Sequence, residues 1–460
     1  MEEMIMDIEQ KLNAQKLFFR KGYTLDPSYR KQALKNLRKA IMVNENEVFE
    51  ALRTDLGKSS YEAFASEIGL VYSEISYMLR NMDRLRRPSH VPTSPANFPS
   101  TGRIIKEPYG SVLIMAPWNY PFQLSLIPLI GAVAAGNCAV VKPSDYAPSV
   151  AHIIDVIIDT AFDKRHVFTV TGGRQANHSL LSNPFDYIFF TGGKTVGRLV
   201  MHAAAEHLTP VTLELGGKSP CIVDRTADIS LAAKRIAWGK FLNCGQTCVA
   251  PDYIYVHKSV KDDFLKAFIR SIEAFYGTDP INCKDYGKIV NTKHFDRLTG
   301  LFKDVPLYYG GRTDRDRCRI APVIIDNAAW DMKVMQEEIF GPVMPVLEYE
   351  DINEVKHQIR NHPKPLALYL FTSSKKVEKD ILGSVSFGGG CVNDTIMHLC
   401  SSAMPFGGVG ESGMGNYHGK YSFDTFTHKK SILKKDTHID IPMRYAPYSH
   451  SLKLLKMILR

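Results

Sequence analysis

The chain has 460 residues, of which 45% are hydrophobic and 23% are charged, and its formal net charge is +9 at pH 7. The length predicts two or three lobes with sizeable cores, and the near-average composition excludes a long disordered arm. The positive charge would suit anionic ligands. Lysine and arginine are spread along the chain, however, so we expect no nucleic-acid partner.

Eight cysteines are scattered through the sequence, without a dense disulfide framework and without the paired C-x-x-C spacing of a metal site. We therefore expect no metal and a reducing compartment. Residues 1–10 carry four acidic side chains and lack an apolar core, which excludes a secretory signal and a basic transit peptide. The cytoplasm is the expected location.

Helices are expected in the first eighty residues, over 29–42, 46–56 and 61–82, where apolar side chains recur three or four residues apart. Four prolines in residues 87–99 exclude a helix there. This segment is expected to be extended and to lead into a strand over 100–106.

Residues 111–141 contain no charged side chain, but Pro117, Pro121 and Pro128 argue against a membrane span. The run is interpreted as a strand, a helix and a second strand, and this alternation continues along the chain. Strands are expected over 111–115, 139–142, 167–171, 187–190 and 210–215, and then near 220–223, 253–257, 320–325, 343–347 and 366–371. Helices are expected over 124–135, 150–162, 175–181 and 196–206, and then near 228–242, 259–276, 291–303, 351–360 and 374–382. Such alternation predicts a parallel, doubly wound sheet.

Towards the C-terminus, glycine runs at 388–390 and 406–410 predict loops. The alternating segment 421–433 predicts a strand. Residues 452–459 predict an amphipathic basic helix that is too short to span a membrane, so no membrane span is expected.

The segment 243–253, NCGQTCVAPDY, follows a helix-permissive run over 231–241, and Gly245 supplies the stop for that helix. Cys248 stands just past the break, where its backbone N–H is free to face a ligand. A thiol in such a place is expected to have a lowered pKa, which makes Cys248 a candidate nucleophile. A buried structural cysteine is the alternative.

Two other segments have the context of a ligand site. Residues 189–197, FFTGGKTVG, follow an expected strand and open an expected helix, as phosphate sites do, although Ile188 excludes a Walker P-loop. Lys142 ends a buried strand at the edge where open α/β sheets bind ligands. A surface lysine at a strand end is the alternative.

Three separated segments occur in the order typical of aldehyde dehydrogenases, and the chain resembles that superfamily from about residue 61 to about residue 447. Residues 243–253 resemble the nucleophile segment, LELGGK at 213–218 the general-base segment, and PWNYP at 117–121 the oxyanion segment. PFGGVG at 405–410 and YHGKYSFDTFTH at 417–428 resemble the class 3 branch in particular.

The resemblance implies oxidation of an aldehyde to a carboxylic acid with NAD or NADP, and class 3 substrates are medium-chain aliphatic or aromatic aldehydes. Cys248 would attack the carbonyl carbon, and the Asn119 side chain with the Cys248 N–H would hold the oxyanion. Glu214 would activate the water that hydrolyses the thioester, and an apolar pocket is expected to raise its pKa. A turn residue is the alternative for Asn119.

The resemblance also implies the cofactor contacts. The turn that leads from the FFTGG strand into the next helix would border the pyrophosphate, through Thr191, Gly192, Gly193, Val196 and Gly197. Lys142 would reach the adenosine ribose, and Asp145 would set the cofactor choice. Asp145 stands where Glu is more frequent, and its shorter carboxylate repels a 2′-phosphate less, so NAD and NADP both stay open.

Glu338 would accept hydrogen bonds from the nicotinamide ribose, and Phe340 would pack beside the ring or the ribose. Without the resemblance, Glu337 and Glu338 are interpreted as a solvated helix end. Tyr120, Phe122 and Met397 are candidate walls of the substrate pocket, and core filling is the alternative for each.

The expected fold is α/β, with a doubly wound parallel-sheet cofactor lobe, a second α/β catalytic lobe and a small β dimerisation arm. We expect a dinucleotide-binding domain over 1–86 and 107–216, a catalytic domain over 217–410, an arm over 87–106 and 411–445, and a tail over 446–460. The arm strands lack a partner in a compact two-lobe chain, so a homodimer is expected.

Other functions remain open. A CoA-acylating relative shares the cysteine but usually lacks the glutamate base, and a thiolase or protease would need a histidine near Cys248. A non-catalytic oligomeric binding protein on the same fold is a further alternative. Cys244 is interpreted as packing, with a redox partnership to Cys248 as the alternative.

Overall fold

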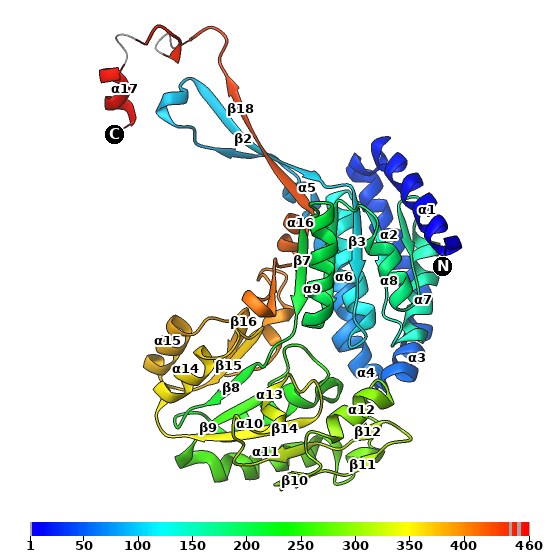
Figure 1. Ribbon diagram of the computed structural model, residues 1–460, viewed down its shortest axis with the longest axis vertical. Coiled ribbons are helices and arrows are strands. Elements are labelled where there is room, and N and C mark those ends of the chain that lie inside the picture. The colour runs from blue at the N-terminus through cyan, green and yellow to red at the C-terminus, as the bar shows by residue number, and fades with distance from the viewer. Residues whose placement is uncertain (1, 441–443, 449–451, 460) are drawn as a thin grey trace.

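The computed structural model describes residues 2–440, 444–448 and 452–459, which form two α/β lobes and a projecting arm (Figure 1). Met1 and residues 441–443, 449–451 and 460, which belong to the expected first domain, arm and tail, lie outside the described residues. The predicted fold class is confirmed. The domain boundaries stay predictions.

The first lobe is built on a six-stranded sheet that is parallel except for the edge pair β17·β7. In spatial order its strands are β17 (Gly413–Met414), β7 (Val211–Leu215), β6 (Tyr187–Gly192), β3 (Ser111–Met115), β4 (Cys138–Lys142) and β5 (Val167–Thr169). Its helices are α1 (Glu2–Arg20), α2 (Pro27–Val43), α3 (Glu45–Leu56), α4 (Ser60–Ala63), α5 (Gly69–Leu85), α6 (Pro121–Ala135), α7 (Pro148–Ala161), α8 (Arg174–Leu181), α9 (Lys194–Glu206) and α16 (Lys420–Thr425).

Alternate residues of the central strand β3 face two different cores. Val112 and Ile114 pack in the cluster that contains α2, α6 and α7, whereas Leu113 and Met115 pack in the cluster that contains α1, α8 and α9. Burial on both faces explains the uncharged run at 111–141. In the described part of the chain, no helix has the length and apolar character needed to cross a membrane.

The second lobe holds a seven-stranded sheet in which the β10·β13 pair is antiparallel and the other pairs are parallel. In spatial order its strands are β10 (Tyr309–Gly310), β13 (Val323–Ile325), β14 (Val343–Tyr349), β9 (Tyr253–His257), β8 (Pro220–Val223), β15 (Ala367–Phe371) and β16 (Gly389–Val392), with a separate ribbon of β11 (Thr313–Asp314) and β12 (Arg319–Ile320). Its helices are α10 (Ile229–Phe241), α11 (Lys261–Tyr276), α12 (Thr292–Thr299), α13 (Lys333–Gln336), α14 (Ile352–Arg360) and α15 (Lys375–Ser384).

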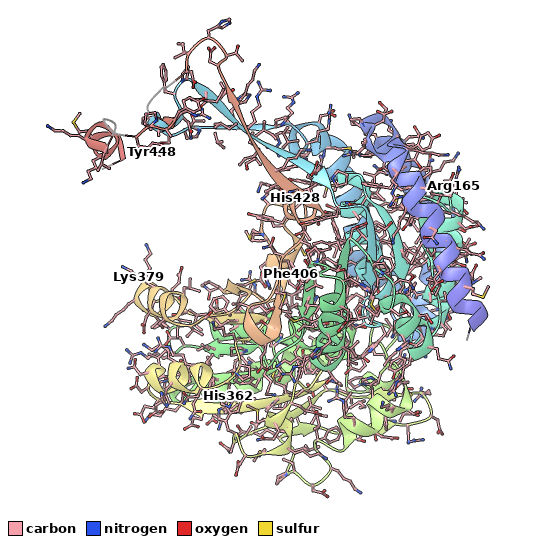
Figure 2. All side chains as sticks on the ribbon, turned by 45° about the horizontal axis from the view of Figure 1, so that its top comes forward. Arg165, His362, Lys379, Phe406, His428 and Tyr448 are labelled. Carbon is pink, nitrogen blue, oxygen red and sulfur yellow. The ribbon has the colours of Figure 1, made fainter. Side chains whose placement is uncertain are left out.

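The arm is an antiparallel sheet of β1 (Ser89–Val91), β2 (Ser100–Pro108) and β18 (Thr427–Lys435). Figure 1 shows it projecting away from both lobes, with α17 (Leu452–Leu459) near its tip. In Figure 2, His428 marks the start of β18 and Tyr448 lies toward the end of the arm.

Several predicted elements differ from the structure, and the strand near 320–325, for example, is divided between β12 and β13. The prediction of a strand over 421–433 was wrong at its start, where residues 420–425 form the helix α16. Phe423 and Phe426 are three residues apart and both are buried, which is the spacing of a helix. The loop at 388–390 is in fact the start of β16, where a Cβ on Gly390 would lie 2.0 Å from the Leu368 carbonyl oxygen. The helix over 61–82 contains a π-helical turn, η2 (Phe64–Ile68), between α4 and α5.

Candidate active site

A cavity of about 620 Å³ is lined by residues of both lobes. Eight of the predicted site residues line it, namely Asn119, Thr191, Gly192, Gly193, Glu214, Cys248, Glu338 and Phe340. His362, labelled in Figure 2, belongs to its wall on the second lobe. Segments more than two hundred residues apart in the sequence therefore meet at one site.

The turn that presents Cys248 is made by three successive residues in the left-handed conformation. Helix α10 ends at Phe241, and Asn243, Cys244 and Gly245 then have φ of 51°, 54° and 73°. A Cβ on Gly245 would lie 2.3 Å from the Gly341 carbonyl oxygen, so only glycine fits. The predicted helix stop is confirmed.

The thiol of Cys248 is partly buried, and its acidity differs from the prediction. Burial, together with the nearby carboxyl groups of Glu338 and Glu214, raises the pKa of Cys248 to about 12. The expected lowering of this pKa was wrong, because burial disfavours the charged thiolate and two acidic side chains in the same cavity add to this effect.

This environment predicts how Cys248 reacts with iodoacetamide in the cofactor-free protein. Because its pKa is raised from 9.0 to about 12, the thiolate fraction is small near neutrality and grows as the pH rises. The alkylation rate of the Cys248 peptide, followed by mass spectrometry, should increase about tenfold per pH unit from about pH 7 to about pH 10. A plateau below about pH 9 would contradict this.

Glu214 stands at the carboxyl end of β7 and is buried. Neither carboxyl oxygen has a hydrogen-bond partner among the described residues. Burial raises the pKa of Glu214 well above its ordinary value, as predicted. Its register neighbour on β6, Thr191, also has a buried hydroxyl without a partner among the described residues. Two orphaned polar groups at one sheet edge indicate a site for a polar ligand or water.

Asn119 follows β3 and is fixed to the loop that carries Cys248. Its side-chain amide donates to the Gln246 carbonyl at 3.1 Å, and its own carbonyl accepts from the Asn243 side chain at 2.8 Å. The neighbouring Tyr120 hydroxyl lies 2.6 Å from the Thr247 hydroxyl. The Asn119 side chain keeps a second N–H for a ligand.

The start of α9 has open space beside it. A Cβ on Gly193, the residue that caps α9, would meet nothing within 4 Å. Backbone N–H groups at a helix start bind phosphate, so this open cradle and the unpartnered Thr191 hydroxyl fit a pyrophosphate. Gly197 lies within α9, where a Cβ would come 2.7 Å from the Leu215 side chain, so it permits close packing of helix and strand.

Four predicted cofactor residues, Lys142, Asp145, Val196 and Gly197, lie outside the cavity lining, at or near the same edge of the sheet. Lys142 ends β4 and is buried, and burial lowers its pKa. Asp145 is exposed three residues later. Their cofactor roles stay predictions.

Glu338 lines the cavity beside Gly216, and a Cβ added at Gly216 would lie 2.0 Å from the Glu338 carboxylate. Burial, together with the Asp252 charge, raises the pKa of Glu338 to about 8. The solvated-end interpretation holds for exposed Glu337, which pairs with Arg297 at 3.0 Å, but not for Glu338.

The segment that carries Glu338 is tied to the second lobe by an ion pair. Lys218 donates to Asp252 at 2.5 Å and to the Glu337 carbonyl at 2.9 Å. Asp252 accepts from the Ile339 N–H at 2.9 Å. These contacts fix the backbone on both sides of Glu338.

The aldehyde dehydrogenase family model matches residues 5–432. The chain belongs to this family. It is 49% identical over 451 residues to the 4,4'-diaponeurosporen-aldehyde dehydrogenase of Staphylococcus aureus (strain NCTC 8325 / PS 47), with 98% of each chain covered. It is 42% identical over 443 residues to aldehyde dehydrogenase family 3 member B1 of Mus musculus, with 96% of this chain and 95% of the relative covered.

Solved structures agree with this assignment. The substrate-bound state of Staphylococcus aureus AldH has a TM-score of 0.97 and 48% identity, with 98% of this chain and 99% of that chain covered. An NAD+ complex of an aldehyde dehydrogenase from Bacillus cereus has a TM-score of 0.85 and 26% identity, with 94% and 89% covered. The predicted resemblance to class 3 aldehyde dehydrogenases is therefore confirmed, and the protein is an enzyme of this family.

Some residues of this aldehyde dehydrogenase lie elsewhere than expected. Tyr120, Phe122 and Met397 do not line the described cavity, and Phe122 is wholly buried in the core. Cys244 is buried, and burial raises its pKa, which favours the packing interpretation. Its redox role is untested.

The sequence interpretation missed several residues of the cavity and its support. Gly216 and Lys218 lie within the quoted LELGGK segment, so their neighbourhood was found without their roles. His294 and Arg297 line the cavity from α12, and no local pattern around them indicates a ligand.

Proposed function

We propose that this aldehyde dehydrogenase oxidises apolar aldehydes, of the medium-chain aliphatic or aromatic kind, to carboxylic acids with NAD or NADP. The observation that carries the proposal is the meeting of Cys248, Asn119 and an unpartnered Glu214 in one cavity. A nucleophile, an oxyanion donor and a water-activating base are the three groups that this reaction needs.

In the first half of the reaction, the Cys248 thiol gives up its proton to water and its sulfur attacks the aldehyde carbon, which forms a thiohemiacetal. The negative charge on oxygen is held by the Asn119 side-chain amide and the Cys248 N–H. A bound nicotinamide dinucleotide would accept the hydride that leaves the thiohemiacetal carbon, and this oxidation gives the thioester on Cys248. The N-terminal turn of α9 would hold the pyrophosphate of the dinucleotide. Lys142 would hold the adenosine ribose, and Glu338 and Phe340 would hold the nicotinamide half.

In the second half, water hydrolyses the thioester. Glu214 has no competing hydrogen-bond partner among the described residues, and burial raises its pKa, which makes its carboxylate a stronger base toward water than an exposed glutamate. This unpartnered base disfavours a CoA-acylating reaction, which needs no water activation. It also disfavours a non-catalytic binding protein, because an orphaned buried carboxyl group is destabilising.

A panel of aldehydes of increasing length, assayed with NAD and with NADP, tests this function. The name of the Staphylococcus aureus relative supports adding a long polyene aldehyde to the panel. We expect oxidation of the medium-chain and aromatic members, with the acid as product. An acyl-CoA product, or no oxidation of any aldehyde, would contradict the proposal.

The oligomer and location are also proposed. The arm leaves strand β1 exposed along its length, and Phe98, Ile432 and Leu433 are exposed hydrophobic side chains on the same arm. Unpaired strand edges with apolar neighbours support a homodimer built through the arm. Light scattering should give twice the chain mass of 51.7 kDa.

The eight cysteines are free, which supports a location in the reducing cytoplasm.

A further inference from the structure

Three ionisable side chains lie together next to Asn119, the proposed oxyanion donor, and do not line the cavity. This cluster consists of Lys58, which follows α3, Glu62 on α4 and Glu67 on the π-helical turn η2. The side chains of Lys58 and Glu67 are fully buried, and their charged atoms are 2.5 Å apart. None of the three lines the cavity. A buried ion pair is stable only when its remaining hydrogen-bonding capacity is used.

The remaining hydrogen bonds of the Lys58–Glu67 pair go to the segment that carries Asn119. The second Glu67 oxygen accepts from the backbone N–H groups of Phe122 at 2.9 Å and Gln123 at 3.2 Å, in the first turn of α6. The Lys58 ammonium donates to the Asn119 carbonyl at 3.2 Å. The pair therefore fixes the backbone at Asn119 and just after it.

The same cluster also holds the Cys248 loop. Glu62 accepts from the Asn243 N–H at 3.0 Å, and the Asn243 side chain donates to the Asn119 carbonyl at 2.8 Å. Asn119 belongs to the first lobe and Asn243 to the loop after α10, so the cluster joins the two sides of the oxyanion site. The π-helical turn is the local irregularity that carries Glu67, and such turns are frequent at functional sites.

We propose that Lys58 and Glu67 are positioning residues that hold the Asn119 oxyanion donor in register with Cys248. The inference rests on the proposed oxyanion role of Asn119. Neither residue lines the cavity, so the pair acts through Asn119 rather than on the substrate. An oxyanion donor must be placed to within a few tenths of an ångström, and a shift of about 1 Å costs up to about 100-fold in rate.

A double-mutant cycle on the full-length enzyme tests the inference. Lys58→Met, Asn119→Ala and the double variant are compared by kcat with an aldehyde and saturating NAD. Lys58→Met should lower kcat about 10- to 100-fold in the wild-type background, with the Kd for NAD unchanged. In the Asn119→Ala background the same substitution should have little further effect, because the donor that it positions is already gone.

Additional variants separate positioning from folding. Lys58→Met/Glu67→Gln removes both buried charges, so it should recover the melting temperature while kcat stays low. It also replaces Lys58→Met in the cycle if that variant does not fold. Lys31→Met is the matched control, because Lys31 pairs with Asp83 at 2.6 Å on α2 and α5 and does not line the cavity. Its kcat should equal that of the wild type.

The outcomes distinguish the inference from the proposed function. An equal loss of kcat in both backgrounds, or an unchanged kcat in a folded Lys58→Met/Glu67→Gln variant, would overturn the positioning role. An Asn119→Ala variant with wild-type kcat would overturn the oxyanion role itself. Loss of NAD binding in Lys58→Met would mean that the pair supports the lobe as a whole, which also overturns the inference.

Discussion

Replacement of Cys248 by serine is expected to abolish aldehyde oxidation, with a fall in kcat of at least about 10³-fold. A hydroxyl is a far weaker nucleophile than a thiol, so the attack on the aldehyde carbon should fail. Binding of NAD, measured by fluorescence titration, should be unchanged because serine keeps the volume and the backbone turn at this position.

A second cysteine substitution provides the control. Cys283 is also partly buried and does not line the cavity, so Cys283→Ser should oxidise aldehydes at the wild-type rate. Substantial activity in Cys248→Ser would show that another residue forms the covalent bond. Loss of NAD binding in the same variant would show instead that the substitution disturbs the site as a whole.

The sequence was sufficient for the architecture where local pattern and packing agree. The strand at 111–115 was predicted to the residue, because residues 112–115 are all apolar and the run is bounded by Gly110 and Pro117. It failed where tertiary contacts decide. Gly390 was interpreted as a loop glycine, although it is needed because the Leu368 carbonyl approaches too closely for a side chain.

The candidate site shows the same division. Cys248, Glu214 and Asn119 lie in segments that motifs identify, and the structure brings all three to one cavity. The pKa of Cys248 could not be predicted, because Glu338 contributes from a position ninety residues later. The Lys58 contact with Asn119 spans 61 residues, and a lysine after a helix carries no local sign of it.

The second large effect is expected for Glu214→Gln, which should separate the two halves of the reaction. Glutamine has the same shape as glutamate, and the wild-type carboxyl group makes no hydrogen bond among the described residues, so the exchange breaks no contact there. An amide does not take a proton from water. Thioester formation should therefore proceed while hydrolysis stalls, with a fall in the steady-state rate of about 10²- to 10⁴-fold.

Rapid mixing with an aldehyde and NAD measures this directly. Glu214→Gln should release about one NADH per subunit in a fast burst, followed by almost no turnover, and intact-mass analysis should find the acyl group on Cys248. Glu74→Gln is the matched control, because Glu74 is also buried, has a pKa raised to about 7 by burial and does not line the cavity. It should turn over at the wild-type rate. Full turnover in Glu214→Gln would identify another base for the water, and the absence of a burst would place Glu214 in the first half of the reaction.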